Sequence, residues 1–220
     1  MALMQEVESL IFGFDPSSGK VDNPVLVLLE KVQEYGHDYF EGKNAVGKPF
    51  YIMRMCEIFQ LGIPGPNQND AVIRAVKRAS EHYNMKPYLV IETNGLGQNV
   101  YDHCQQELPN VYGIYTLTDG SSVSRDGRIY KVPGVNMAAE LTKLTEYSRL
   151  IIPATIKDRK KIIQQFVNFT WKRKESGTLT VENLKSSNHD DICDATGLAA
   201  WFGVYGIRKI TTFDKSKLGL

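Results

Sequence analysis

The chain has 220 residues, with 42% hydrophobic residues, 23% charged residues and a formal net charge of +1 at pH 7. This length suits one well-buried globular domain and is short for two. No run approaches the ~18 consecutive apolar residues that a membrane span requires, and the start has no basic stretch ahead of an apolar one, so neither a span nor a signal peptide is predicted. Because the total charge is near zero, any nucleic-acid surface has to be local, with acids gathered elsewhere.

In chain order, short apolar runs first predict three strands. They cover residues 9–15, 25–31 and 50–61. The third ends at the breaker sequence GIPGPNQND. Apolar residues at 72, 73, 76 and 79 then have helical spacing and predict a helix over 69–84, with Asn69 or Asp70 as its cap.

Strands and helices alternate in the rest of the chain. The expected elements are a strand at 88–92, a helix at 98–107, a strand at 111–117, a helix at 136–149, a strand at 150–153 and helices at 157–172 and 189–205. Asp126-Gly127 lies between two alternating segments and predicts a hairpin over 119–134, inserted outside the core. Three strands followed by this alternation predict an α/β fold whose sheet is part antiparallel and part parallel.

Acidic residues occupy informative places in these elements. Asp15 closes the first strand and Glu92 closes a central one, while Asp190, Asp191 and Asp194 fall within a ~100° arc at the start of the last helix. A carboxylate at the end of a buried strand is costly to desolvate unless it is paired or bound to metal. For any single position the ordinary alternative is a turn or cap residue, and Asp190 fits a helix cap.

Three sequence blocks carry a resemblance to a known family. The blocks are GFDPSSG, IETNGLGQNVYD and NHDDICDATGLAAW, and the segment VPGVNMAAELTKLTEYSRLIIP adds to them. Together they resemble the nuclease domain of the large terminase subunit of tailed bacteriophages, a member of the ribonuclease H-like superfamily. The resemblance runs from about residue 9 to 205, and the HDD-x-x-DA pattern is its most specific part.

The resemblance implies a ribonuclease H-like mixed sheet flanked by helices, with an inserted β-hairpin. It implies a single nuclease domain over 1–220 with its core at about 9–205, and we expect no ATPase domain in this chain. The implied activity is a metal-dependent endonuclease that cuts double-stranded concatemeric viral DNA during packaging. Two Mg²⁺ or Mn²⁺ ions, ~3.5–4 Å apart and held by hard carboxylate oxygens, would drive phosphodiester hydrolysis.

The resemblance also assigns roles to the acids. Asp15, Glu92 and Asp191 would be the metal ligands, with Asp194 or Asp190 as an additional or alternative ligand. All five are therefore candidate catalytic residues.

Two further residues and two decoys complete the site prediction. Asp22 resembles an acid that serves the second metal, and His189 would assist water or phosphate, unless it only makes hydrogen bonds at the helix start. A zinc site at His189 and Cys193 is rejected because no second ligand pair is near, and the three widely spaced cysteines argue for a reducing compartment. The segment 42–49 resembles a phosphate-binding loop, but Pro49 replaces the required hydroxyl residue, so it is rejected too.

Basic clusters are candidates for phosphate contacts that read no sequence. The predicted DNA-binding residues are Arg125, Arg128, Lys131, Lys172, Arg173 and Lys174, and a further basic cluster is Lys157, Arg159, Lys160 and Lys161. A solvated surface explains each cluster equally well. The hairpin at 119–134 is the expected mobile element guarding the cleft.

The expected partners are double-stranded DNA and, in the full machine, an ATPase domain, the small terminase subunit and the portal, in the cytoplasm of the infected host cell. Two other functions stay open. One is another ribonuclease H-like nuclease, such as a junction resolvase or a hybrid nuclease, and the other is a non-catalytic module that grips DNA.

Overall fold

The computed structural model describes residues 4–16, 23–38, 43–60, 65–118, 120, 122–173, 179–183 and 190–207. Within these residues nine strands form one sheet in the order β7-β8-β6-β5-β1-β2-β4-β9, with β3 paired to β2, and β10 pairs with β11 in a separate hairpin. The strands are β1 (Met4–Asp15), β2 (Val25–Asp38), β3 (Lys43–Val46), β4 (Phe50–Ile58), β5 (Tyr88–Glu92), β6 (Val111–Leu117), β7 (Ser124–Asp126), β8 (Ile129–Pro133), β9 (Leu150–Ile151), β10 (Phe169–Arg173) and β11 (Leu179–Asn183).

The sheet is mixed, as the sequence predicts. Strands β1, β2 and β4 pair antiparallel, whereas β5, β6 and β8 extend the sheet from β1 in parallel.

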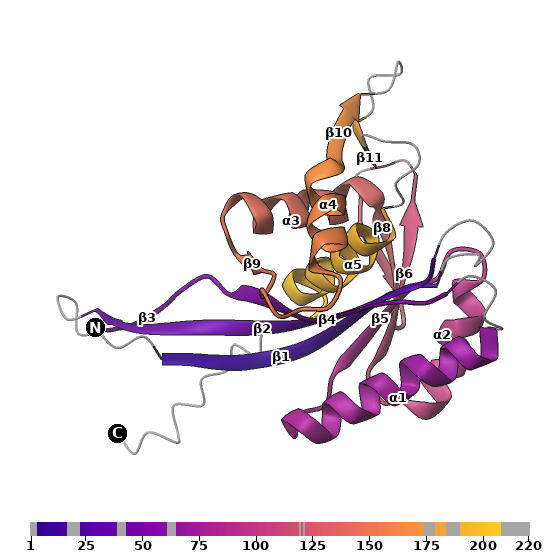
Figure 1. Ribbon diagram of the computed structural model, residues 1–220, viewed down its shortest axis with the longest axis horizontal. Helices are drawn as coiled ribbons and strands as arrows, with labels where there is room; N and C mark the ends of the chain where they lie inside the picture. The colour runs from indigo at the N-terminus through magenta and orange to yellow at the C-terminus, as the bar shows by residue number, and fades with distance from the viewer. Residues whose placement is uncertain are drawn as a thin grey trace.

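Helices cover both faces of the sheet (Figure 1). One face carries α1 (Gly65–Tyr83) and α2 (Gly97–Glu107), and the other carries α3 (Gly134–Glu146), α4 (Arg159–Asn168) and α5 (Asp191–Tyr205). Because side chains alternate along a strand, a strand covered on both faces is apolar at every position. In β1, Leu10, Phe12 and Phe14 lie in the core beneath α1 and α2, and Ile11 lies in the core beneath α5.

Helix α5 lies directly on the centre of the sheet. A Cβ atom at Gly13 of β1 would be 1.9 Å from the backbone oxygen of Ala195, so the helix and the strand touch through their backbones. Ala195 and Ala199 are fully buried at this crossing. Small residues on both elements therefore let α5 approach β1 closely enough to bring its first turn to the strand ends.

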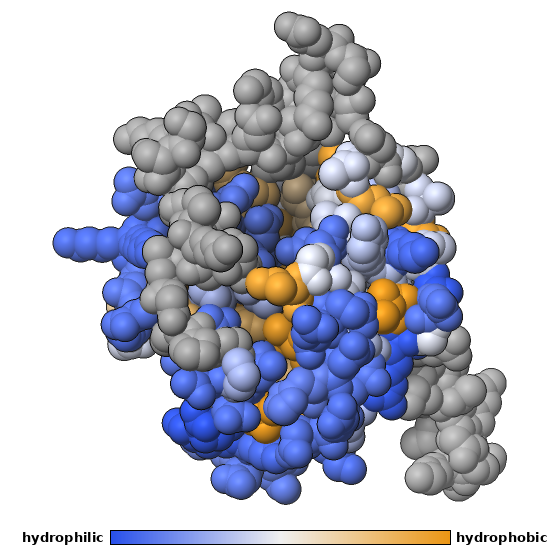
Figure 2. Space-filling model, turned by 90° about the vertical axis from the view of Figure 1, so that its right-hand side faces the viewer, coloured by the Kyte–Doolittle hydropathy of each residue, from blue (hydrophilic) through white to orange (hydrophobic). Residues whose placement is uncertain are grey.

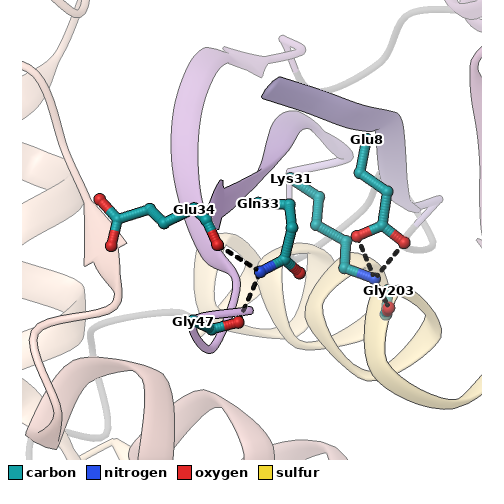
Figure 3. A network of polar contacts seen from close by, with 6 residues as sticks. All are labelled: Glu8, Lys31, Gln33, Glu34, Gly47 and Gly203. Atoms are coloured by element: carbon teal, nitrogen blue, oxygen red, sulfur yellow. Dashed lines mark hydrogen bonds and ion pairs between the residues drawn. The ribbon is translucent and has the colours of Figure 1, made fainter. Parts of the chain in front are cut away.

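A buried lysine ties the other end of α5 to the sheet (Figure 3). Lys31 of β2 is 3% exposed and donates a hydrogen bond of 3.0 Å to the carbonyl oxygen of Gly203 in α5. It also forms an ion pair of 3.1 Å with Glu8 of β1. Beside it, the amide of Gln33 donates to the carbonyl oxygens of Glu34 and Gly47. The helix is thus fixed at both ends of its contact with β1 and β2.

Several expected elements differ from those observed. Helix α1 begins at Gly65, so neither Asn69 nor Asp70 caps it. The helix expected over 157–172 ends at Asn168, and the chain continues as strand β10. In the expected hairpin, β8 pairs with β6 and buries Tyr130 and Val132, so this hairpin is an edge of the main sheet and not an insertion outside the core.

Two further observations concern the part of the chain that the structure describes. Residues Lys43–Val46 form strand β3, and strand β4 follows, so the phosphate-binding loop is correctly rejected: the strand that follows cannot present a helix N-terminus to phosphates. None of the described helices is both long enough and apolar enough to cross a membrane.

Candidate active site

Two of the predicted acids close neighbouring parallel strands. In the register of β1 and β5, Phe14 pairs with Ile91, and Asp15 and Glu92 are the next residues on the two strands. Adjacent strands are ~4.8 Å apart, so these two carboxylates leave the sheet side by side at its carboxyl edge. Asp15 is 8% exposed, and Glu92 is partly exposed.

The remaining acids begin α5. Asp190 occupies the N-cap position but its side chain makes no capping hydrogen bond, so the ordinary cap explanation does not hold for it. Asp191 and Asp194 lie in the first turn, where the helix dipole favours negative charge. Asp191 is 6% exposed.

A glutamine from α4 holds the start of α5. The side-chain oxygen of Gln165 accepts a hydrogen bond of 3.0 Å from the backbone N–H of Ile192, and Gln165 is 6% exposed. This bond satisfies one of the donors that a helix start leaves without a partner. Gln165 thereby fixes the turn that carries the acids, a role that the sequence analysis missed because the two residues are far apart in the chain.

The turn after Glu92 is shaped by Asn94 and Gly97. Asn94 donates to the carbonyl of Thr116 at 2.9 Å and accepts from its N–H at 2.7 Å, so its side chain continues the pairing between β5 and β6. A Cβ atom at Gly97 would lie 1.8 Å from the carbonyl oxygen of Glu92. Only glycine lets the start of α2 pack against Glu92, which fixes the direction in which the strand ends.

Asp194 is affected electrostatically by the other four acids. The pKa of Asp194 is well above its usual range, first because surrounding protein atoms desolvate it and then because of repulsion from the other four acids. These are Asp190, Asp15, Glu92 and Asp191. Asp194 is nevertheless accessible to solvent, since it borders an open pocket.

Glu92 is perturbed in the same direction. Burial raises the pKa of its carboxyl, and repulsion from Asp190 adds to the rise. The hydroxyl of Thr116 stands beside the carboxylate and lowers the pKa, although it forms no regular hydrogen bond in the structure. Ionisation of Asp194 in α5 and of Glu92 in β5 is therefore unfavourable in free energy, and a bound cation would offset this cost.

A pocket of about 220 Å³ opens beside these acids. Figure 2 views this side of the molecule, where hydrophobic side chains lie in a hollow between hydrophilic ones. Both acidic and apolar residues line the pocket. The acidic residues are Glu92, Asp190 and Asp194, and the apolar residues include Leu117, Val135, Met137, Leu141, Phe169 and Leu198.

The donor set fits a hard divalent cation. Carboxylate oxygens are the ligands that Mg²⁺ and Mn²⁺ prefer, and mutual repulsion of the acids favours a cation between them. Among the described residues, no three histidine, cysteine or acidic side chains are close enough to hold one ion as they stand.

The other predicted site residues either lie outside the described residues or lie on a separate hairpin. Asp22, His189 and Lys174 lie outside the described residues. Lys172 and Arg173 lie on β10, in a hairpin that projects from the body of the molecule (Figure 1). That hairpin begins at Phe169, which lines the pocket.

The basic residues of the β7–β8 hairpin lie farther from the pocket. Arg125 packs over the ring of Tyr130 at 4.8 Å, and Arg128 donates to the carbonyl oxygen of Pro109 at 2.7 Å. Their turn precedes β8, whereas the pocket is lined by residues that follow it, so a strand of roughly 16 Å separates the two. Lys131 is exposed on β8 itself.

Comparison with known proteins decides the family. The family model described as "Terminase RNaseH-like domain" matches residues 66–200, which is more than half of the chain. The chain belongs to this family. Membership confirms the resemblance found in the sequence, and the match includes Glu92 and all three acids of α5.

Solved structures of terminase nucleases share the fold. The large terminase nuclease from thermophilic phage G20c is 18% identical, with a TM-score of 0.56 over 90% of this chain and 82% of that chain. The nuclease domain of the large terminase subunit gp2 of bacterial virus Sf6, a mutant with manganese and beta-thujaplicinol, is 12% identical, with a TM-score of 0.55 over 87% of each chain. The G20c nuclease is also known with bound magnesium, at 20% identity and a TM-score of 0.54 over 87% of this chain and 80% of that chain. No curated protein matches the chain.

Proposed function

We propose that this chain is a metal-dependent endonuclease that cuts double-stranded viral DNA during genome packaging. The observation that carries the proposal is the gathering of five carboxylates at one edge of a terminase-type ribonuclease H-like sheet. Structures of two similar nucleases contain magnesium or manganese, which supports the same requirement here.

Asp15, Glu92 and Asp191 are the proposed metal ligands, and Asp194 or Asp190 is a further or alternative one. Two bound divalent ions would supply activation of a water molecule and stabilisation of the leaving oxygen of a phosphodiester. The protein's own part is to hold the ligands in place: the strands β1 and β5 fix two of them, and α5, held by Gln165, fixes the third. Asp22 and His189 remain proposed helpers.

The β10–β11 hairpin supports a proposed DNA path. It starts at the pocket and carries Lys172 and Arg173, whose charges suit contacts with phosphates. We propose that these two residues and Lys174 contribute more to DNA binding than Arg125 and Arg128 do.

The proposal extends to the setting of the reaction. The domain, with its core at about 9–205, would act in the cytoplasm of the infected cell. An ATPase domain, the small terminase subunit and the portal would be its partners in the packaging machine.

The test is cleavage of supercoiled plasmid with Mg²⁺ or Mn²⁺. Nicking and linearisation are expected from the parent protein and from the control Asp102→Asn, which changes an exposed acid of α2. Asp15→Asn, Glu92→Gln and Asp191→Asn are each expected to lower cleavage to background. The same changes should preserve or raise the melting temperature in metal-free buffer, because they remove a repelling charge.

Three outcomes would redirect the proposal. If the folded parent protein and Asp15→Asn bind DNA equally and neither cuts, the chain is a DNA-gripping module. Faster cleavage of four-way junctions or of RNA–DNA hybrids than of duplex DNA would favour a resolvase or a hybrid nuclease. A large loss of folding on changing Glu92 or Asp191 would give these acids a structural role.

A further inference from the structure

The pocket beside the acids has a composition that the proposed chemistry does not explain. Phosphodiester hydrolysis needs carboxylates, ions and water, all of them polar. The lining is mixed: the acids Glu92, Asp190 and Asp194 and the threonines Thr116 and Thr118 make it polar in part, and most of the other lining residues are apolar. Its apolar side chains come from β6, α3, α5 and the junction of α4 with β10, so several elements contribute to it.

The substrate itself limits what can fill this space. A phosphodiester at the acids is joined on each side to a deoxyribose, and each deoxyribose carries one nucleobase. Because the acidic and apolar residues belong to one pocket, the groups attached to that phosphate are the ones that reach the apolar residues. The sugar would lie between the acids and the apolar residues, and the flat face of the base is the apolar surface of DNA that could contact those residues.

Phe169 is the aromatic residue among the lining side chains. It is partly exposed and lines the pocket, so part of the residue is within reach of a ligand there. Bases stack on aromatic side chains with little regard to sequence, because every base has a π-face. Met137 lies in α3 and adds a flexible, polarisable side chain that adapts to flat ligands of different size.

In continuous duplex DNA the base faces are stacked on one another and cannot enter a side pocket. A base reaches such a pocket only when it leaves the stack, which costs least where the base is mismatched or already unpaired. We propose that this pocket receives an unpaired nucleobase next to the scissile phosphate, so that the enzyme prefers duplex DNA at locally opened base pairs. This inference rests on the proposed nuclease function and names the form of DNA that the site selects.

The experiment compares two substrates in Mn²⁺. One is a fully paired oligonucleotide duplex, and the other has the same sequence with one central mismatch. For the parent protein, kcat/KM at the mismatch should exceed that at the corresponding paired site by about tenfold, in line with the stacking of one base on an aromatic ring. Equal values would overturn the proposal and mean that the pocket contacts only the sugar.

Two variants test the residue that carries the preference. Phe169→Ala should reduce the ratio between the two substrates by about tenfold. Val167→Ala is the matched control, because Val167 lies two residues earlier on α4, is 71% exposed and does not line the pocket, so the ratio should stay parental. A parental ratio in a folded Phe169→Ala protein would overturn the role of the ring.

A binding measurement makes the test independent of cleavage and of any variant. The fluorescent base 2-aminopurine is placed at the mismatch, and the parent protein is added with Ca²⁺ in place of Mn²⁺. Stacking in the pocket predicts a fluorescence change that is at least several-fold larger for the mismatched duplex than for the paired one. Equal changes would overturn the proposal. Loss of all cleavage from a folded protein would instead refute the nuclease function, which keeps the two failures distinguishable.

Discussion

The contact between Gly13 and α5 predicts the effect of a single added methyl group. In the variant Gly13→Ala the new Cβ atom would lie 1.9 Å from the carbonyl oxygen of Ala195, whereas ordinary contact begins at 3.4 Å. The separation of β1 from α5 therefore has to grow by about 1.5 Å. Both atoms belong to rigid backbone, so no side-chain rotation can relieve the clash.

The expected consequences concern both stability and activity. Overpacking of a core costs about 1–3 kcal/mol, which lowers the melting temperature of a domain of this size by about 2–12 °C. The acids of α5 would move with the helix, while Asp15 and Glu92 stay on the sheet. Since a misplacement of ~1 Å costs about 100-fold in rate, plasmid cleavage should fall by about that factor in protein that is still folded.

Thermal unfolding followed by circular dichroism and plasmid cleavage below the melting transition measure the two effects. Gly197→Ala is the control for stability, because its Cβ atom would meet Met137 at an ordinary 3.7 Å. Alanine is the better helix former, so this variant should be more stable by about 0.5–1 kcal/mol. A Gly13→Ala protein that melts and cuts like the parent would refute the direct seating of α5 on β1.

Three further predictions concern residues that hold the same helix or lie in the core. Gln165→Leu leaves the N–H of Ile192 without its partner and should cost about 1–3 kcal/mol in urea unfolding; an unchanged midpoint would show that the bond is absent in solution. Lys31→Met should destabilise the protein by a similar amount, because it removes a buried ion pair. Lys77→Met removes an exposed ion pair and should lower the free energy of unfolding by less than about 1 kcal/mol, so equal losses in the two variants would contradict the burial argument. Burial raises the pKa of the Cys56 thiol to about 12, and it raises the pKa values of the buried Cys104 and Cys193 thiols as well, so all three thiols should stay protonated at pH 8; rapid labelling of the native protein by iodoacetamide at that pH would contradict this.

The fold was predictable because its elements are locally encoded. Apolar runs of strand length gave β1, β2, β4, β5 and β6, and the spacing of apolar residues gave the helices. The start of α1 was missed although Gly65-Pro66 signals it, since proline is favoured in the first helical turn. Strand β10 was missed for a similar reason: its sequence FTWKR is rich in strand-forming residues but directly follows a helical pattern.

The acids of the site were predictable one by one, and their assembly was not. Each stands at the end of a strand or the start of a helix, which is visible in the sequence. The register that sets Asp15 beside Glu92, and the bond from Gln165 to the start of α5, join residues far apart in the chain. Such contacts leave no local pattern, so only the family resemblance linked these residues beforehand.

The burial of α5 has a consequence for local opening of the protein and for amide hydrogen exchange. Of its 15 residues, 12 are buried: every residue from Asp191 to Gly203 except Asp194. A helix enclosed in this way cannot fray while the rest of the domain persists, so exchange of its amide hydrogens should require opening of the whole domain. Any ligand that tightens the grip of its first turn would therefore slow hydrogen exchange across the entire sheet.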